Sequence, residues 1–207
     1  QGIDKVKDLV GKSVAVEEGF VGHFFLLYVL DQAGISPEEV KIIPMTTDQA
    51  GTAFLSGSVD VAVTWEPLLS SALSRKGAKV LVSSADVEPI LADALFLSEA
   101  FLESKPLEAK NLVQALLEAN ELWLKQPGKY TEFISQKWDW PVEDISGALA
   151  TVEVYGTQKQ QELFGTAKQK GKIYEFLDKA NELWHKTGII AKRVDVQQLV
   201  QPSLINN

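Results

Sequence analysis

The feature that most constrains the fold is an alternation of short β-rich runs with helical stretches through the first half of the chain. Strands are expected at residues 13–17, 40–43, 59–64 and 79–83, with a fifth at 93–97. Helices are expected between them at residues 22–33, 47–56 and 67–75. Because parallel strands need crossover connections, this order predicts an α/β fold, a parallel-type sheet with helices on both faces.

The second half of the chain has a helical pattern. Pro106 opens a segment whose apolar residues recur every three or four positions, namely Leu112, Ala115, Leu116, Ala119, Leu122 and Trp123. Further helices are expected at residues 129–137, 141–150 and 165–187. We therefore expect an α/β lobe at residues 1–98 and a mostly helical remainder at 99–207. These later helices have little sheet of their own to cover.

Composition excludes several classes of function. The 207 residues carry a net charge of -8, which argues against binding nucleic acid or an anionic membrane through bulk electrostatics. The chain has no cysteine, so disulfides, thiolate catalysis and cysteine-based zinc sites are excluded. His23 and His185 are too few and too far apart to indicate a metal cluster. No apolar run reaches the length of a membrane span and no signal peptide is recognisable, so we expect a soluble chain.

The expected strand at 59–64 ends in a polar aromatic corner. Trp65 and Glu66 follow it, and Pro67 stands where a helix can begin. Ligands of open α/β sheets bind outside the carboxyl ends of the strands, so this corner is a candidate binding position. The alternative is that Trp65 fills a gap in the core and Glu66 faces water.

A second candidate is the turn after the first strand, at Gly19, Phe20, Val21, Gly22 and His23. Backbone amides at the start of the next helix are unpaired, which suits an anionic group such as sulfonate, carboxylate or nitrate. The two glycines permit a close approach of the backbone, and the Phe20 ring can enclose a ligand. The pattern of a phosphate-binding loop is absent. The alternative is an ordinary β–α turn in which His23 is a hydrogen-bonded residue.

Thr46, Thr47 and Asp48 follow the expected strand at 40–43 and should lie at the same edge. Their side chains can meet a ligand, although capping of the next helix explains them equally well. The acidic segment at 86–89 and Asp93 can rim the same crevice, or simply face water. Nothing in the sequence assembles a catalytic set, a metal site or a cofactor site, so we expect a binding protein and no enzyme.

Several segments, in chain order, resemble one protein family. They are residues 7–16 (KDLVGKSVAV), 19–34, 60–67 (DVAVTWEP), 79–84 (KVLVSS), and the tail from Asn181 to Pro202. Together they are similar to the solute-binding proteins of ABC importers of the nitrate/sulfonate/taurine type, the NMT1/THI5-like family. The resemblance implies a two-lobed clamshell in the periplasm that closes on a small solute and delivers it to a membrane permease. It places the same three corners in the binding site.

The resemblance also carries a departure. The family begins with a β–α–β–α–β unit that forms most of the first lobe, and this chain starts close to where the crossing into the second lobe occurs. The apolar faces of the later helices, which include Leu116, Leu122 and Trp123, must then be covered by the remaining sheet or by a second copy in a dimer or domain-exchanged oligomer. A ligand-sensing domain of a signalling protein is the alternative function. The related thiamine-pyrimidine synthase is disfavoured because its cysteine-rich motif is absent.

Overall fold

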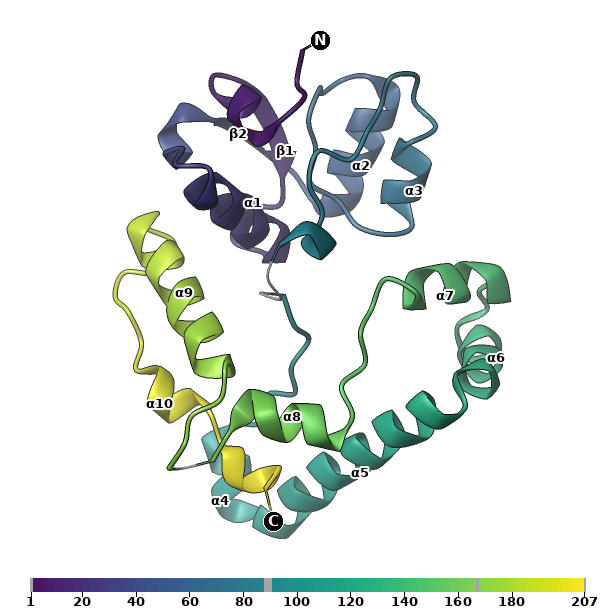
Figure 1. Cartoon of the computed structure of the whole chain (residues 1–207), viewed down its shortest axis with the longest axis vertical. Coiled ribbons are helices and arrows are strands. Elements are labelled where there is room, and N and C mark those ends of the chain that lie inside the picture. Colours follow the sequence, from purple (N-terminus) through teal and green to yellow (C-terminus); the bar gives the residue numbers. More distant parts are fainter. Residues whose placement is uncertain (1, 88–90, 167, 207) are drawn as a thin grey trace. The chain divides into compact units, whose positions relative to one another are not determined.

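The computed structural model describes residues 2–87, 91–166 and 168–206. The chain divides into two compact units (Figure 1). The first consists of Gln1–Asp93 and Ala180–Arg193, and the second of Ala94–Lys179 and Val194–Asn207. The later border falls within helix α9 (Ile173–Lys186), so each unit is built from two separate stretches of sequence.

The sheet of the first unit is parallel, as the sequence predicts. Strand β1 (Ser13–Val16) pairs with β2 (Lys41–Pro44), with Ser13 opposite Lys41 and Val16 opposite Pro44. On its other side, β1 meets residues 61–63 through a parallel bridge between Ala15 and Ala62. The Ala15 amide donates to the Val61 carbonyl at 3.0 Å, and the Val63 amide donates to the Ala15 carbonyl at 2.9 Å. Strand β1 is therefore the central strand.

Helices cover both faces of this sheet, because alternate residues of β1 point to opposite sides. Val14 and Val16 pack into one apolar cluster with Leu26 and Leu30 of α1 (Val21–Gln32). Ala15 packs on the other face with Ala50 of α2 (Thr47–Ser56). The predicted fold class is confirmed, and both helices begin and end within one residue of the expected positions.

Four other expectations about the first half are wrong. Residues 59–64 form only the bridge at Ala62, and the expected helix at 67–75 is reduced to α3 (Leu68–Ala72). Residues 79–83 and 93–97 are not strands, and the Phe96 side chain is 86% exposed. A β-rich run becomes a strand only where a neighbouring strand pairs its backbone groups, and the sequence of the run does not report that neighbour. Short 3-10 turns complete this part at Val6–Leu9, Pro37–Glu39 and Ser84–Asp86.

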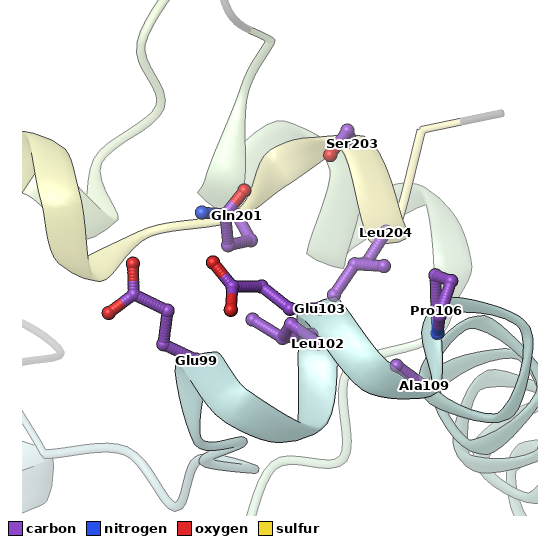
Figure 2. A pocket seen from close by; sticks show the side chains of 8 residues that line it. All are labelled: Glu99, Leu102, Glu103, Pro106, Ala109, Gln201, Ser203 and Leu204. Atoms are coloured by element: carbon purple, nitrogen blue, oxygen red, sulfur yellow. The ribbon is translucent and has the colours of Figure 1, made fainter.

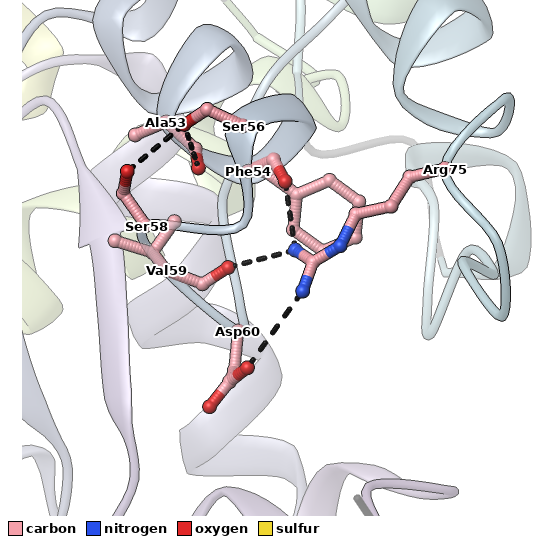
Figure 3. A network of polar contacts seen from close by, with 7 residues as sticks. All are labelled: Ala53, Phe54, Ser56, Ser58, Val59, Asp60 and Arg75. Atoms are coloured by element: carbon pink, nitrogen blue, oxygen red, sulfur yellow. Dashed lines mark hydrogen bonds and ion pairs between the residues drawn. The ribbon is translucent and has the colours of Figure 1, made fainter.

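Arg75 fixes the path by which the chain leaves α2 and enters the sheet (Figure 3). Its Nη1 donates to the carbonyl oxygens of Phe54 at 2.7 Å and Val59 at 2.9 Å. Its guanidinium lies 4.6 Å from the centroid of the Phe54 ring, and its Nη2 lies 3.9 Å from Oδ1 of Asp60. Gly57 ends α2 with a φ of 81°, a left-handed conformation that favours glycine. Together these contacts direct residues 59–64 toward β1.

The second unit is helical, as expected. Its helices are α4 (Glu99–Ser104), α5 (Pro106–Lys125), α6 (Pro127–Trp138), α7 (Val142–Leu149), α8 (Thr157–Phe164), the first part of α9, and α10 (Val196–Leu199), followed by a 3-10 turn at Pro202–Leu204. The expected single helix at 165–187 is wrong, because α8 ends at Phe164 and α9 begins at Ile173. Gly165 has a φ of 67° and bridges to Lys170, which breaks the helix there. Across the described ranges, no helix is both long and apolar enough to cross a bilayer.

Candidate functional site

The three corners predicted from the sequence follow three neighbouring parallel segments. Strand β1, strand β2 and residues 61–63 run in the same direction, and Ala15 is level with both Ile43 and Ala62. Their carboxyl ends therefore lie at one edge of the sheet. In parallel sheets this edge is where ligands bind.

Two of the corners are joined directly. The Glu17 carboxylate, which follows β1, accepts hydrogen bonds from the Thr47 amide at 3.0 Å and the Thr47 hydroxyl at 2.9 Å. The Met45 amide also donates to the Val16 carbonyl at 3.2 Å. Thr47 is buried and its donors are engaged by Glu17. Thr47 therefore joins the loop after β1 to the start of α2.

The start of α1 presents free backbone amides. Phe20 is its N-cap residue and no side chain caps the helix. The amides of Val21 and Gly22 belong to the first turn, whose N–H groups have no partner within a helix. The positive end of the helix dipole lies at the same place. Gly19 precedes the helix with a φ of 81°, so the chain turns sharply into it.

His23 supports this turn from inside the unit. Its side chain is 2% exposed, and its Nδ1 accepts a hydrogen bond from the Gly19 amide at 3.1 Å. Its ring meets the Trp184 ring edge to face at 5.5 Å between centroids. Burial lowers the pKa of His23 below its ordinary value of 6.5, and the nearby Glu18 carboxylate acts in the opposite direction. A neutral ring fits this role, because Nδ1 must accept while Nε2 carries the proton.

Gly22 lets α1 approach the sheet closely. A Cβ atom built on Gly22 would lie 3.2 Å from Cγ1 of Val63 and 3.8 Å from Cγ2 of Val16. The helix start therefore packs against the strand segment that leads into Trp65. Around it, the side chains of Phe20, Val21 and Trp65 are 59%, 45% and 44% exposed. Exposed aromatic and aliphatic groups thus flank an uncapped helix start.

The other predicted site residues are polar, and most have local partners. The Thr46 hydroxyl accepts from the Gln49 amide at 3.3 Å and caps α2. The Glu66 carboxylate accepts from the amide and hydroxyl of Ser70 at 3.1 and 3.0 Å. Asp48 is exposed at the first turn of α2. Capping, the alternative given above for the threonine segment, accounts for the hydrogen bond of Thr46. The alternative given for Glu66 was that it faces water, and its carboxylate is instead engaged by Ser70.

The acidic segment expected to rim the crevice lies partly outside the described residues, because residues 88 and 89 are among those not described. The Asp86 carboxylate accepts from the amide and hydroxyl of Ser83 at 2.7 and 2.8 Å. These bonds lower its pKa, and they occupy the carboxylate in a local turn.

Two residues near the site were not found from the sequence. Within the described part of the chain, Thr64 Oγ1 is buried and has no hydrogen-bond partner, although it ends the segment that leads to Trp65. A Cβ built on Gly51 would lie 3.1 Å from this oxygen. In the sequence, the signal that could have identified Thr64 was a hydroxyl side chain at the end of an apolar run. Trp184 is the second residue that was not found from the sequence, and no local sequence pattern connects it with His23.

The described residues hold no group of three or more His, Cys, Asp or Glu side chains suited to a metal ion. A cavity of about 310 Å³ lies in the second unit, between α4, the start of α5 and the final 3-10 turn (Figure 2). Glu99 and Glu103 line it together with Gln201 and Ser203. Two carboxylates do not suit an anion, so this cavity is a poor match for the chemistry of the sheet edge.

Comparison with known proteins identifies a family and several relatives. A family model described as "NMT1/THI5 like" matches residues 1–130. The taurine-binding periplasmic protein of Escherichia coli is 30% identical over 210 residues, covering 96% of this chain and 63% of the relative. This chain therefore spans less than two thirds of that relative's length.

Solved structures share the fold. The periplasmic aliphatic sulphonate binding protein SsuA from Escherichia coli matches 100% of this chain and 68% of its own, with a TM-score of 0.74 and 23% identity. The desulfurization enzyme DSZB also matches 100% of this chain and 72% of its own, with a TM-score of 0.61 and 13% identity. At these identities the likeness concerns the fold alone. The family model covers more than half of the sequence, and the chain belongs to the NMT1/THI5-like family.

Proposed function

We propose that this chain forms part of the solute-binding component of an ABC importer, and that it binds a small sulfonate or a similar anionic or zwitterionic solute. The observation that carries the proposal is the uncapped start of α1, flanked by exposed Phe20, Val21 and Trp65 at the carboxyl edge of a parallel sheet. The relative from Escherichia coli is named for taurine, and SsuA is named for aliphatic sulphonates.

The chemistry of a sulfonate suits this edge. Its oxygens can accept hydrogen bonds from the amides of Val21 and Gly22, and its charge is favoured by the helix dipole. Its alkyl part can lie against the exposed rings of Phe20 and Trp65. The chain's net charge of -8 opposes any anion at long range, so affinity must come from these short-range donors.

Within this proposal the predicted site residues take different roles. Gly19, Phe20, Val21 and Trp65 form the contact surface, and the buried Gly22 contributes its backbone amide. His23, Thr46, Thr47 and Glu66 hold the surrounding turns through the bonds described above. Asp48 is exposed at the start of α2, and in this proposal its carboxylate meets the ammonium group of a zwitterion such as taurine.

The wider role is part of the same proposal. We infer a periplasmic or other extracytoplasmic location and a membrane permease as the partner that receives the solute. The lobes at 1–98 and 99–207 and self-association of the chain also remain predictions. We expect binding without turnover, although DSZB has the same fold and is an enzyme. The test is to incubate the chain with taurine and to follow sulfite release. Accumulation of sulfite would contradict this expectation.

A proline at the first helical position tests the amide donors. Proline is compatible with this position, and Phe20 before it is already extended, with φ -110° and ψ -179°. Val21→Pro should therefore keep α1 and remove one donor. A hydrogen bond to a charged group contributes about 1.5–3 kcal/mol, so the dissociation constant for taurine or ethanesulfonate should rise about tenfold or more. Titration calorimetry on the purified chain measures it.

Val21→Ala is the matched control, because it removes the side chain and keeps the amide. It should weaken binding by a smaller factor than Val21→Pro. Equal affinities for the two variants would show that the amide does not hold the anion. No heat and no change in tryptophan emission across taurine, ethanesulfonate, nitrate and sulfate would contradict the proposed function itself.

A further inference from the structure

Trp184 connects α9 to the start of α1. It lies in the stretch Ala180–Arg193, the part of the later half of the chain that belongs to the first unit. Its half-buried ring meets the His23 ring at 5.5 Å between centroids and 62° between planes, and the Phe24 ring at 5.9 Å and 40°. Both partners follow directly on the amides that the proposed site uses. Trp184 itself is not part of the proposed contact surface.

Helix α9 holds Trp184 against α1. Leu183, the residue before it, is 2% exposed and packs in one apolar cluster with Tyr28. Nζ of Lys186, two residues after it, lies 3.5 Å from Oδ1 of Asp31 near the end of α1. The indole is therefore carried by a helix that contacts α1 on both sides of it, and not by a loop.

The His23 ring carries this contact to the turn before α1. Its Nδ1 accepts a hydrogen bond from the Gly19 amide at 3.1 Å, and this bond depends on the rotation of the ring. Edge-to-face packing against Trp184 favours one orientation of the ring. The indole also helps to keep His23 only 2% exposed, so that water does not compete for Nδ1.

The hydrogen bond to His23 is a main support of the Gly19 turn. Gly19 has a φ of 81°, and no atom of the described residues lies within 4 Å of a Cβ atom built on it, so side-chain packing does not fix the chain there. The Phe20 amide donates to the Glu17 carbonyl at 3.3 Å, which is longer than a usual backbone bond. A change in the His23 ring is therefore expected to free the turn.

We propose that Trp184 is a positioning residue for solute binding, and that it acts through the His23 ring. The indole fixes the ring, and the ring holds the Gly19 turn. The turn leads into the amides of Val21 and Gly22 and so sets their position. This inference rests on the proposed function, because it takes the start of α1 as the place where the solute binds. It adds that affinity depends on a residue of α9 that does not touch the solute.

The pKa of His23 reports on this packing. Burial lowers the pKa, and the Glu18 carboxylate in the same turn acts in the opposite direction. The side chains that α9 places in this region are the apolar Leu183 and Trp184, Lys186, which pairs with Asp31, and the exposed His185. On the side of the sheet, Val16 and Val63 lie close to Gly22. Removal of the indole should therefore raise the pKa of His23 toward its ordinary value of 6.5.

Trp184→Ala should weaken solute binding although it leaves every proposed contact in place. A turn that has become free must be ordered again on binding, which raises the dissociation constant by about fivefold to thirtyfold for each residue that is fixed. We expect a loss in this range for taurine or ethanesulfonate, measured by titration calorimetry on the purified chain. Trp184→Phe keeps a ring beside His23 and should recover most of the affinity.

Leu183→Ala is the matched control, because it truncates the neighbouring buried residue of the same helix. It should lower the urea midpoint of unfolding and keep the affinity of the parent. Far-ultraviolet circular dichroism checks that each variant folds. If Trp184→Ala does not fold, Trp184→Leu takes its place, since it removes the ring and keeps an apolar side chain.

Nuclear magnetic resonance gives a readout that needs no solute. In Trp184→Ala the Gly19 amide should shift and exchange faster with water, and the pKa of His23 should rise. Leu183→Ala should change neither. The chain has two histidines, so His185→Gln assigns the resonances of His23.

A double variant tests whether Trp184 acts through His23. In His23→Gln the ring contact is already absent, so adding Trp184→Ala should cost little further affinity. Losses that add in full overturn the inference, as does a Trp184→Ala chain with the affinity and the Gly19 amide of the parent. A parent that binds none of the solutes contradicts the proposed function instead. The Gly19 amide and the pKa of His23 then still decide whether Trp184 holds the turn.

Discussion

Replacing Arg75 tests how the candidate site is held in place. Arg75→Ala removes hydrogen bonds to the Phe54 and Val59 carbonyls, a cation–π contact at 4.6 Å, and a long ion pair with Asp60. The Arg75 side chain is 27% exposed, so the low end of the range for charged hydrogen bonds applies, about 1.5 kcal/mol each. The exposed cation–π contact adds about 0.5 kcal/mol, and the ion pair adds little. We expect a loss of about 3.5 kcal/mol in the free energy of unfolding.

This loss should be localised to the first unit. Urea unfolding followed by circular dichroism gives the change in midpoint, and hydrogen exchange read by mass spectrometry reports residues 13–16 and 59–64 separately. Amides in both segments should exchange faster in Arg75→Ala than in the parent. Arg75→Lys keeps the charge but cannot reach both carbonyls in a fixed fork, so it should lose about half as much.

Lys76→Ala is the matched control, since Lys76 is the neighbouring residue and is exposed. Its free energy of unfolding should stay within about 0.5 kcal/mol of the parent. If Arg75→Ala also stays within that margin, or if exchange at residues 59–64 is unchanged, the Arg75 contacts do not hold this segment and the reasoning is refuted.

Two other changes probe the residues beneath the site. Because burial lowers the pKa of His23, its neutral form contributes stability that is present above pH 6.5 and is lost as the pH falls through the folded pKa. In His23→Gln the side-chain oxygen can still accept a hydrogen bond from the Gly19 amide. The free energy of unfolding of this variant should fall less steeply than that of the parent between about pH 7 and pH 5. An unchanged slope would contradict the role given to the His23 ring. Thr64→Val replaces a buried, unpaired hydroxyl with a methyl group and should stabilise the chain by about 1 kcal/mol, whereas a lower urea midpoint would mean that the hydroxyl has a partner.

The helices and the central strand could be predicted because their signals are local. Thr46 and Gln49 form a capping box at the start of α2, and Gly57 ends it, so its bounds are contained in adjacent residues. Val14 and Val16 identify β1 in the same way. Strands at 79–83 and 93–97 were wrong because their β-branched and apolar residues do not reveal whether a partner strand exists. The break at Gly165 was missed because a left-handed glycine looks like any other in sequence.

For the candidate site too, the features that depend on local sequence could be predicted, and the contacts between distant residues could not. The meeting of three corners at one sheet edge followed from the order of strands and helices, and the parallel pairing agrees with it. The engagement of Glu17 with Thr47, and of His23 with Trp184, was not foreseen. Each pair joins residues far apart in the chain, and only the folded arrangement decides which polar groups remain available to a ligand.

The contribution of α9 to the first unit has a consequence for biosynthesis. Phe24 and Tyr28 of α1 bury their rings against Leu183, with Trp184 packed alongside. On the ribosome, α1 emerges long before these residues, at about 5–20 residues per second, so its apolar side waits for many seconds without its cover. A nascent chain stalled short of Ala180 should therefore bind a chaperone that a chain extended past Arg193 releases.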